Sequence, residues 1–411
     1  MSTFDENLTK YAALAVEVGV NIQPGQTLVI TAPLFAAEFV RKVTKRAYEL
    51  GSPYVHIEWN DEEITRTRYQ LAPEDSFSVY PIPFRAKGWE EFAENNAAFL
   101  AITGQDPDML AGIDPSRIQN NNKAASAALA TFRSYQMSDK VSWCVIAVPS
   151  KEWAAKVFPD TTAEDQVAAL WGAIFQSTRV DQADPVTAWR THTATLDAKA
   201  ERLNQRKYKA LHYTAPGTDL TLELPKGHIW VSAGSYNAKN TLFIANMPTE
   251  EVFTAVEKTG VNGTVASTKP LSYAGNLIDN FSFTFKDGRI VDFSAEQGYD
   301  ALKKLVETDE GSHYLGEVAL VPHQSPISDT NIIFYNTLFD ENASNHLAIG
   351  QAYAFCIEGG KSMNKEQQAE AGLNDSYTHV DFMIGSAEMD IDGILADGSR
   401  EPIFRQGNWA F

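Results

Sequence analysis

The chain of 411 residues is longer than one hydrophobic core normally serves, so two domains are expected. Its 34 Lys and Arg against 53 Asp and Glu give a formal net charge of −19, which disfavours nucleic acid and anionic membranes as partners. The acidic N-terminus and the lack of 18 consecutive apolar residues predict neither a signal peptide nor a membrane span. Cys144 and Cys356 lie in apolar runs without a nearby His, which favours a reducing compartment over disulfides or a catalytic thiol.

The N-terminal half alternates between strand and helix patterns. After an amphipathic helix at the N-terminus, we expect strands at 27–32, 54–59, 97–104 and 140–149 and helices at 36–50, 123–137 and 163–180. Strands separated by helices of crossover length predict an α/β domain with a mainly parallel sheet. No glycine-rich phosphate motif follows these strands, so a nucleotide site is disfavoured. A charged, glycine-free helix at 184–208 is expected to close this first domain, which we place at residues 1–204.

The pattern of residues 205–411 predicts a β-rich α+β domain, which also contains the candidate site residues. Strand-like runs separated by Gly, Pro and Asp turns occur at 210–225, 228–234, 281–295, 316–322, 331–339 and 378–385. The tetrapeptide "KDGR" between two alternating segments is a strong hairpin signal.

Two of the eight histidines have acidic or phenolic neighbours that suggest a site. In "THVDFMIGS", strand alternation places His379 and Asp381 on one face, where they are either solvent decoration or a metal clamp. If a helix opens near Ser344, His346 and Tyr353 also share a face, two turns apart. Imidazole and carboxylate groups bind divalent ions, so the choice depends on which carboxylates join them.

Several carboxylates lie at the ends of apolar strands in the same half. They are Glu250 and Glu251 in "NMPTEEVF", Glu317 at the head of "EVALVP", and Glu341 shortly before His346. A carboxylate beside an apolar strand is partly desolvated, which is costly unless a cation is near. The motifs H-E-x-x-H, C-x-x-C and G-x-S-x-G do not occur, so a thermolysin-like site, a paired-cysteine zinc site and a serine hydrolase are excluded.

Longer motifs resemble those of the aminopeptidase T and aminopeptidase PepS family of bacterial leucyl aminopeptidases, with the PepS-type enzymes most similar. They include "HYTAPGTDLTLELP", "LGEVALVPHQSPIS", "TLFDENASNHLAIGQAYA" and "HVDFMIGSAEMDIDGI", and the likeness extends through the N-terminal half. The resemblance implies a cytoplasmic, homodimeric exopeptidase with two metal ions that releases N-terminal residues from short peptides.

The resemblance also implies which residues form the site. The metal-binding positions carry over to Glu251, Glu317, Glu341, His346, His379 and Asp381. The motif contains both Glu250 and Glu251 and leaves open which of them is the ligand. The implied ions are two divalent cations per subunit, and this ligand chemistry accepts Zn²⁺, Co²⁺, Mn²⁺ or Mg²⁺.

Three residues, Glu317, Tyr353 and Glu250, are expected to act in catalysis. Glu317 would bridge both ions and fix their separation, while Tyr353 would touch a metal or donate a hydrogen bond to the oxyanion. Glu250 would carry a proton from water to the leaving amine. A metal-dependent amidohydrolase acting on non-peptide amides would share every ligand but would not require a free amine. A binding protein with a degenerate site would lack a ligand, and none of the expected ligands is missing.

Overall fold

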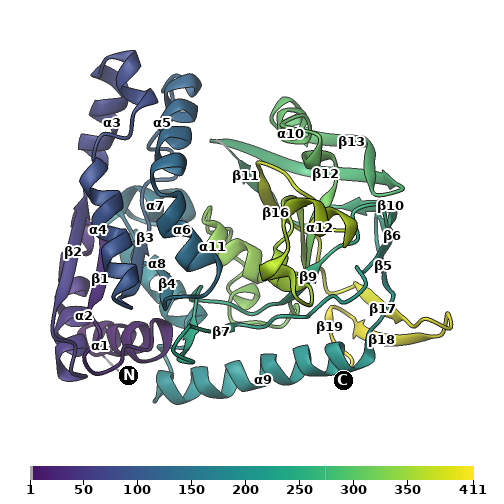
Figure 1. The fold of residues 1–411 in the computed structure, drawn as a ribbon, viewed down its shortest axis with the longest axis horizontal. Helices are drawn as coiled ribbons and strands as arrows, with labels where there is room; N and C mark the ends of the chain where they lie inside the picture. Colours follow the sequence, from purple (N-terminus) through teal and green to yellow (C-terminus); the bar gives the residue numbers. More distant parts are fainter. Residues whose placement is uncertain (1–2, 274) are drawn as a thin grey trace. The chain divides into compact units, whose positions relative to one another are not determined.

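The computed structural model describes residues 3–273 and 275–411 and divides into two compact units (Figure 1). Unit 1 comprises Met1–Thr191 and Gly234–Pro248, and unit 2 comprises His192–Ala233 and Thr249–Phe411. The division falls within the long helix α9 (Pro185–Arg206), which is the helix expected at 184–208. The domain boundary between residues 204 and 205 stays a prediction, because packing within a chain defines compact units and not independently folding domains.

Unit 1 is built on a four-stranded parallel sheet of order β2-β1-β3-β4. The strands are β1 (Leu28–Pro33), β2 (Val55–Asn60), β3 (Ala98–Thr103) and β4 (Trp143–Ala147), with a small hairpin of β7 (Gly234–Tyr236) and β8 (Leu242–Ile244). The helices are α1 (Phe4–Leu14), α2 (Ala37–Glu49), α3 (Glu62–Leu71), α4 (Pro83–Glu94), α5 (Pro115–Ala128), α6 (Ala130–Met137), α7 (Lys151–Val157) and α8 (Ala163–Ser177). Strand β1 has nearly continuous apolar burial, as expected for a parallel strand covered on both faces.

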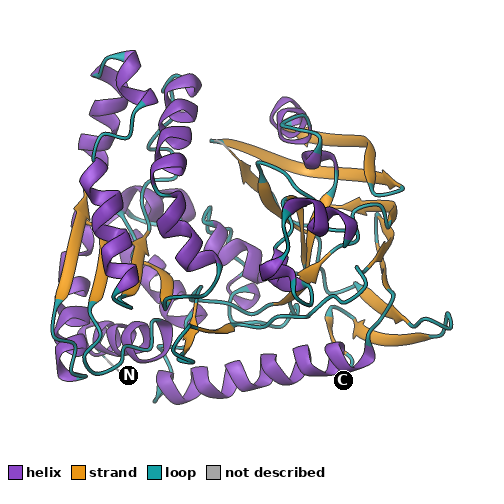
Figure 2. Cartoon of the chain, in the orientation of Figure 1, coloured by secondary structure: helices purple, strands orange, loops and turns teal. Residues whose placement is uncertain are grey.

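Unit 2 contains two sheets (Figure 2). The larger has the order β11-β12-β10-β6-β5-β17-β18-β19, with β13 on β12, and the smaller has the order β16-β15-β14-β9. Its strands are β5 (Ala210–Ala215), β6 (Thr218–Glu223), β9 (Val252–Ala255), β10 (Val261–Ala266), β11 (Leu271–Tyr273), β12 (Asn276–Lys286), β13 (Arg289–Gln297), β14 (Leu315–Leu320), β15 (His346–Gly350), β16 (His379–Met383), β17 (Asp390–Ile394), β18 (Arg400–Arg405) and β19 (Asn408–Trp409). Helices α10 (Tyr299–Val306), α11 (Thr337–Asp340) and α12 (Lys365–Glu370) complete the unit. The predicted fold class, an α/β part followed by a β-rich part, is confirmed.

Some predicted elements differ from the structure. The helix expected at 123–137 is two helices, α5 and α6, because the backbone leaves helical geometry at Leu129, where ψ is 8°. In the strand expected at 228–234, His228 and Val231 form isolated bridges to Ile357 and Phe253, and a regular strand, β7, begins only at Gly234. Apolar residues continue at the same spacing through both segments. The sequence pattern therefore indicates neither the break in the helix nor the loss of the strand.

The segment around Asp340 also differs from its prediction. The expected strand at 331–339 is a loop followed by the short helix α11. The Asp340 carboxylate accepts hydrogen bonds from the backbone N–H groups of Phe334 and Asn336, and the Asn336 side chain accepts one from Leu338 N–H. Such local side-chain bonds give the backbone partners other than a neighbouring strand.

The prediction of a helix that begins near Ser344 is wrong. His346–Gly350 is strand β15, which lies between β14 and β16 in the smaller sheet. Every residue from 342 to 350 is buried, so no face of this segment turns to solvent and its strand alternation is hidden. His346 and Tyr353 therefore do not share a helix face.

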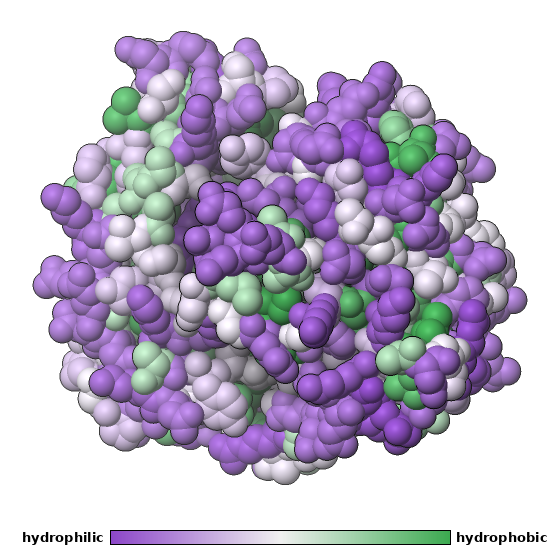
Figure 3. All heavy atoms as spheres, turned by 45° about the vertical axis from the view of Figure 1, so that its right-hand side comes forward, coloured by the Kyte–Doolittle hydropathy of each residue, from purple (hydrophilic) through white to green (hydrophobic). Residues whose placement is uncertain are grey.

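Polar residues predominate on the face drawn in Figure 3, where apolar residues form only scattered patches. This agrees with the mean hydropathy of −0.26. Within the described parts of the chain, no helix is both long and apolar enough to cross a membrane.

Candidate metal centre

The smaller sheet of unit 2 has one apolar and one polar face. On the apolar face, β9, β14, β15 and β16 contribute residues to the main core of the unit, all at most 1% exposed: Val252, Val318, Leu320, Leu347, Ile349 and Phe382. Since side chains alternate along a strand, the residues between them point the other way. Glu317, His346, His379 and Asp381 therefore share the second face.

The register of the strands brings these residues together. Glu317 on β14 lies opposite Ala348 on β15, and Ala348 lies opposite Asp381 on β16. His346 is two residues from Ala348, and His379 is two residues from Asp381, so both imidazoles flank this row on the same face. Only the methyl group of Ala348 stands between the two carboxylates in the row.

The same alternation distinguishes Glu251 from Glu250. On β9, Ala255 pairs with Glu317 and Phe253 pairs with Ala319, so the polar face continues to Glu251. The Glu251 Oε2 atom lies 3.1 Å from His346 Nε2. The Glu250 carboxylate instead lies 3.5 Å from His192 Nε2, and its backbone N–H donates to the Asn342 side chain. The structure thus brings Glu251 to the cluster and turns Glu250 toward α9.

Glu317 lies between two groups of possible ligands. Its Oε1 is 3.9 Å from His346 Nε2, and its Oε2 is 3.8 Å from His379 Nε2. His379 Nε2 is also 3.6 Å from Asp381 Oδ1. Ligand atoms within 4.8 Å of one another form two sets that share Glu317. They are Glu251, Glu317 and His346, and Glu317, His379 and Asp381.

Both imidazoles are oriented by a backbone carbonyl. His346 Nδ1 lies 3.1 Å from the Ser344 carbonyl, and His379 Nδ1 lies 2.7 Å from the Gln351 carbonyl. Nδ1 is the donor in these bonds, which leaves Nε2 of each ring directed at the carboxylates. Gly350, at φ 105°, turns the chain at the end of β15 next to Gln351, and a Cβ there would meet the Thr378 carbonyl at 2.1 Å.

The electrostatics of the cluster fit a cation. Burial, together with Asp381 and Glu251, raises the pKa of Glu317 to about 8, and burial with neighbouring carboxylates also raises the pKa of Glu341 well above its usual value. Burial disfavours charge on Asp381 too, but His379 outweighs it and lowers the pKa of Asp381. The buried Oδ1 of Asp381 has no hydrogen-bond partner. Several desolvated carboxylates, an unsatisfied oxygen and two preoriented Nε2 atoms are a donor set for divalent cations.

We expect metal uptake by this cluster to release protons. Burial opposes charge on the imidazoles, but the neighbouring carboxylates, Glu251 at His346 and Asp381 at His379, outweigh it and raise the pKa of each ring from 6.5 to about 10. These rings and Glu317 hold protons near neutral pH when no cation is bound, whereas ligands bind as the deprotonated groups. Metal affinity should therefore fall as the pH is lowered from about 8 to about 6. Calorimetric titration with Zn²⁺ in buffers of different ionisation enthalpy measures the proton count, and a count of zero would contradict the expectation.

The raised pKa values also determine how the stability of the metal-free protein changes with pH. Glu317 and both imidazoles keep protons in the folded chain at pH values where the unfolded chain has lost them. These three groups therefore stabilise the folded protein at low pH. Thermal stability without metal should decline as the pH rises from about 5 to about 8. Bound metal should reduce this decline, which melting curves with and without chelator would measure.

Two other predicted site residues lie at the edge of the cluster. Glu341 belongs to the short turn after α11, outside both ligand sets, but its carboxylate is close enough to interact with Asp381, Glu251 and Glu317. Tyr353 follows β15, and its ring centroid lies 4.7 Å from that of His379 and 5.2 Å from that of Phe355, on which it stacks. Burial and the nearby carboxylates raise the pKa of the Tyr353 phenol, so it keeps its proton and is a hydrogen-bond donor.

Sequence reasoning did not find the residues that support the cluster. Ser344 and Gln351 act through backbone carbonyls and Ala348 acts by being small, and none of these roles has a side-chain signature. Asn342 bridges the Glu250 N–H and the Leu338 carbonyl. For Asn342, the motif "DENASN" was the available signal in the sequence. A buried amide side chain is expected to form hydrogen bonds with neighbouring backbone groups.

Comparisons with known proteins cover the whole chain. A family model described as thermophilic metalloprotease (M29) matches residues 4–409. Aminopeptidase AmpS of Bacillus subtilis (strain 168) is 58% identical over 100% of both chains, and aminopeptidase PepS of Streptococcus thermophilus is 50% identical over 100% of this chain and 99% of its own. Aminopeptidase T of Thermus aquaticus is 43% identical over 100% of both chains. The solved structure of wild-type AmpT from Thermus thermophilus superposes with a TM-score of 0.94 at 39% identity, over 100% of both chains.

Proposed function

This chain belongs to the M29 family of thermophilic metalloproteases, and from this premise we propose how its buried cluster serves the activity. The chain is a metal-dependent aminopeptidase, because the family is described as metalloproteases and the relatives are named aminopeptidases. We propose that it holds two divalent ions and releases the N-terminal residues of short peptides. The observation that carries the proposal is the position of Glu317, whose two oxygens face different imidazoles at 3.9 and 3.8 Å.

The proposed ligands divide between the two sets. Glu251 and His346 would hold one ion, His379 and Asp381 would hold the other, and Glu317 would be shared by both. Glu341, beside Asp381, would complete the set and present an acidic side chain toward the α-amine of the substrate. Bound divalent ions supply Lewis-acid polarisation of the scissile carbonyl and a water of lowered pKa. This donor set accepts Zn²⁺, Co²⁺, Mn²⁺ or Mg²⁺, and metal analysis of the purified protein would identify the ion.

The residues of the chain itself position the reaction. The protonated phenol of Tyr353 would donate a hydrogen bond to the oxyanion of the tetrahedral intermediate, and its stacking on Phe355 limits its motion. Buried neighbours around His346 and Glu317 exclude bulk water, which strengthens every charge interaction at the site. The Glu250 carboxylate lies near His192 and belongs to neither ligand set, so its role as a proton carrier stays a prediction.

Two measurements on one substrate test the proposal. A chelator should abolish hydrolysis of leucine p-nitroanilide, and Zn²⁺ or Co²⁺ should restore it. Acetylation of the substrate amine should stop turnover by the metal-loaded protein, because an aminopeptidase requires a free α-amine. Activity that survives chelation would contradict metal dependence. Equal turnover of the acetylated substrate would indicate an amidohydrolase of non-peptide amides.

Replacing Tyr353 with Phe should lower kcat by about 100-fold to 1000-fold while KM changes little, because one oxyanion donor typically contributes that much. Metal content should stay at the wild-type value if the phenol serves only the oxyanion. Steady-state kinetics and metal analysis of the same preparation separate the two roles. A kcat within about threefold of wild type would remove Tyr353 from the reaction.

We also propose a cytoplasmic homodimer. Both cysteines, Cys144 and Cys356, are free and buried, which suits a reducing compartment. The dimer rests on the family resemblance. Light scattering coupled to size exclusion would test it, and a mass of one chain would contradict it.

A further inference from the structure

Glu251 is a proposed metal ligand that lies outside the regular pairing of the smaller sheet. Strand β9 begins at Val252, and its ladder with β14 ends at the pair of Val252 and Leu320. The position of the Glu251 carboxylate, 3.1 Å from His346 Nε2, therefore depends on the chain immediately before the strand. A ligand is held precisely only where such a segment is fixed by further contacts.

Two side chains hold the peptide group that joins Thr249 to Glu250. The Thr249 carbonyl accepts a hydrogen bond from His192 Nε2 at 2.8 Å, and the Glu250 N–H donates to Asn342 Oδ1 at 2.8 Å. Thr249, Glu250 and Asn342 are at most 3% exposed, so the two backbone groups depend on partners within the protein. Because a peptide group is planar, bonds to its oxygen and its nitrogen together fix its orientation.

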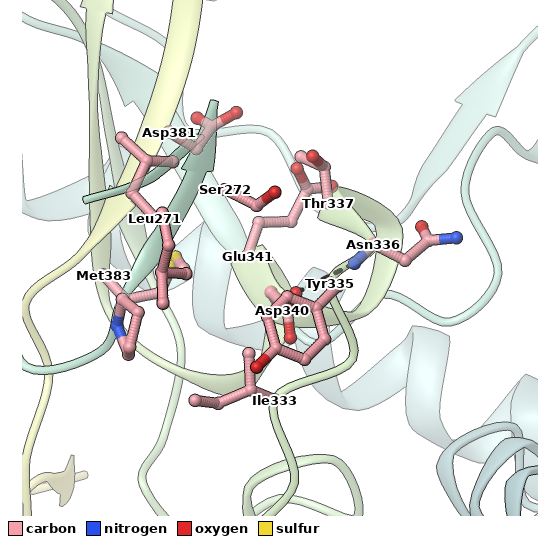
Figure 4. Close-up of a pocket in the computed structure, with 12 residues that line it drawn as sticks. Leu271, Ser272, Ile333, Tyr335, Asn336, Thr337, Asp340, Glu341, Asp381 and Met383 are labelled. Carbon is pink, nitrogen blue, oxygen red and sulfur yellow. Dashed lines mark hydrogen bonds between the residues drawn. The ribbon is translucent and has the colours of Figure 1, made fainter. Parts of the chain in front are cut away.

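The Asn342 amide also reaches a second proposed ligand. Its Nδ2 atom donates to the Leu338 carbonyl at 3.2 Å and lies 3.4 Å from Glu341 Oε1. Glu341 comes from the turn after α11 and, together with Asp381, lines the pocket shown in Figure 4. One buried amide thus connects the segment that carries Glu251 to the segment that carries Glu341.

We propose that His192 and Asn342 form a clamp on the peptide before Glu251 and thereby position this carboxylate for the ion that it shares with His346. Both clamp residues are positioning residues, since neither belongs to a ligand set. The clamp brings a third histidine, from α9, into the support of the metal centre. This inference deepens the proposed function and rests on it.

Removing the His192 donor tests the clamp. His192→Leu keeps a strong helix former in α9 but loses the bond to the Thr249 carbonyl. We expect the ion of the Glu251 and His346 set to bind about 10-fold to 100-fold more weakly, as on loss of an outer partner of a ligand, while the other ion keeps its affinity. Calorimetric titration of the metal-free protein with Zn²⁺ measures both affinities.

A conservative variant separates the hydrogen bond from the bulk of the ring. In His192→Gln, the amide nitrogen takes the place of Nε2 as donor, so both Zn²⁺ affinities should stay within about threefold of wild type. If His192→Gln loses as much affinity as His192→Leu, the bond to the Thr249 carbonyl does not position the ligand.

The two members of the clamp should act together. Asn342→Leu keeps a similar shape but leaves the buried Glu250 N–H without its partner, and it should weaken the same ion by about 10-fold to 100-fold. Since His192 and Asn342 hold one peptide group, the protein with both Leu substitutions should lose less affinity than the product of the two single losses. A loss equal to that product would show two independent contacts and contradict the clamp.

Asn237→Leu is the matched control. Asn237 is a buried amide of unit 1 that also accepts backbone N–H bonds, from Lys239 and Thr241, and donates to Ser142 Oγ. Its replacement should lower the melting temperature and leave both Zn²⁺ affinities unchanged. The His192 variants carry the test alone if Asn342→Leu does not fold.

Two results would overturn the inference. One is a Zn²⁺ affinity of His192→Leu equal to that of wild type, and the other is an equal loss of affinity in Asn237→Leu. Wild-type protein that binds no Zn²⁺ would instead contradict the proposed function, so the two failures are distinguishable.

Discussion

Replacing Glu317 with Gln is expected to abolish aminopeptidase activity and to remove bound metal. The substitution keeps the shape of the side chain but takes away the only carboxylate that faces both imidazoles among the described residues. Loss of an outer partner of a metal ligand already costs about 10-fold to 100-fold in affinity or activity, so loss of a shared ligand should cost more than about 100-fold. Metal content per chain and kcat/KM for leucine p-nitroanilide measure both effects.

The control for this experiment is Glu257→Gln. Glu257 is a partly buried carboxyl in the same unit, its pKa is raised by burial, and it lies outside both ligand sets. The Glu257→Gln variant should retain metal and activity. The metal-free Glu317→Gln protein should also lose less stability than the wild type between about pH 5 and pH 8, because the neutral amide replaces a carboxyl that resists ionisation. A Glu317→Gln protein that keeps its full metal content would contradict the shared position.

Strand alternation was sufficient to place His379 and Asp381 on one face. Their segment has one apolar face, formed by Val380 and Phe382, so the period of two is visible in the sequence. The parallel sheet of unit 1 was predictable for a similar reason, because short apolar strands alternate with amphipathic helices of crossover length.

The environment of His346 was not predictable in this way. Strand β15 is covered on both faces, so "HLAIG" has no polar side to give the period, and short buried runs fit either a helix or a strand. Tertiary packing between β14 and β16 decides the outcome, and local propensity does not contain that information.

Convergence of the site depends on strand register, which sequence spacing does not specify. Glu317 and Asp381 come together because both pair with Ala348 from opposite sides. A shift of one residue in either pairing would turn a ligand into the apolar core. The register also resolves which of the adjacent acids, Glu250 and Glu251, reaches the cluster, a choice that the motif leaves open.

Replacing Ala348 with Leu is therefore expected to remove metal without changing any proposed ligand. Ala348 is fully buried and lies directly between Glu317 and Asp381, where Cβ atoms of neighbouring strands are about 5 Å apart. The added isobutyl group would occupy the space between the two carboxylates. We expect metal content to fall below half of the wild-type value and kcat/KM to fall by more than about 100-fold, as for loss of a ligand.

Overpacking alone destabilises a core by about 1–3 kcal/mol, so a matched control is needed. Ala200→Leu adds the same group at a buried position of α9, in the core cluster with Leu196 and Leu203 and away from the carboxylates. Both variants should show lower melting temperatures, but only Ala348→Leu should lose metal and activity. If Ala348→Leu binds as much metal as Ala200→Leu, the ions do not lie over the Glu317, Ala348 and Asp381 row.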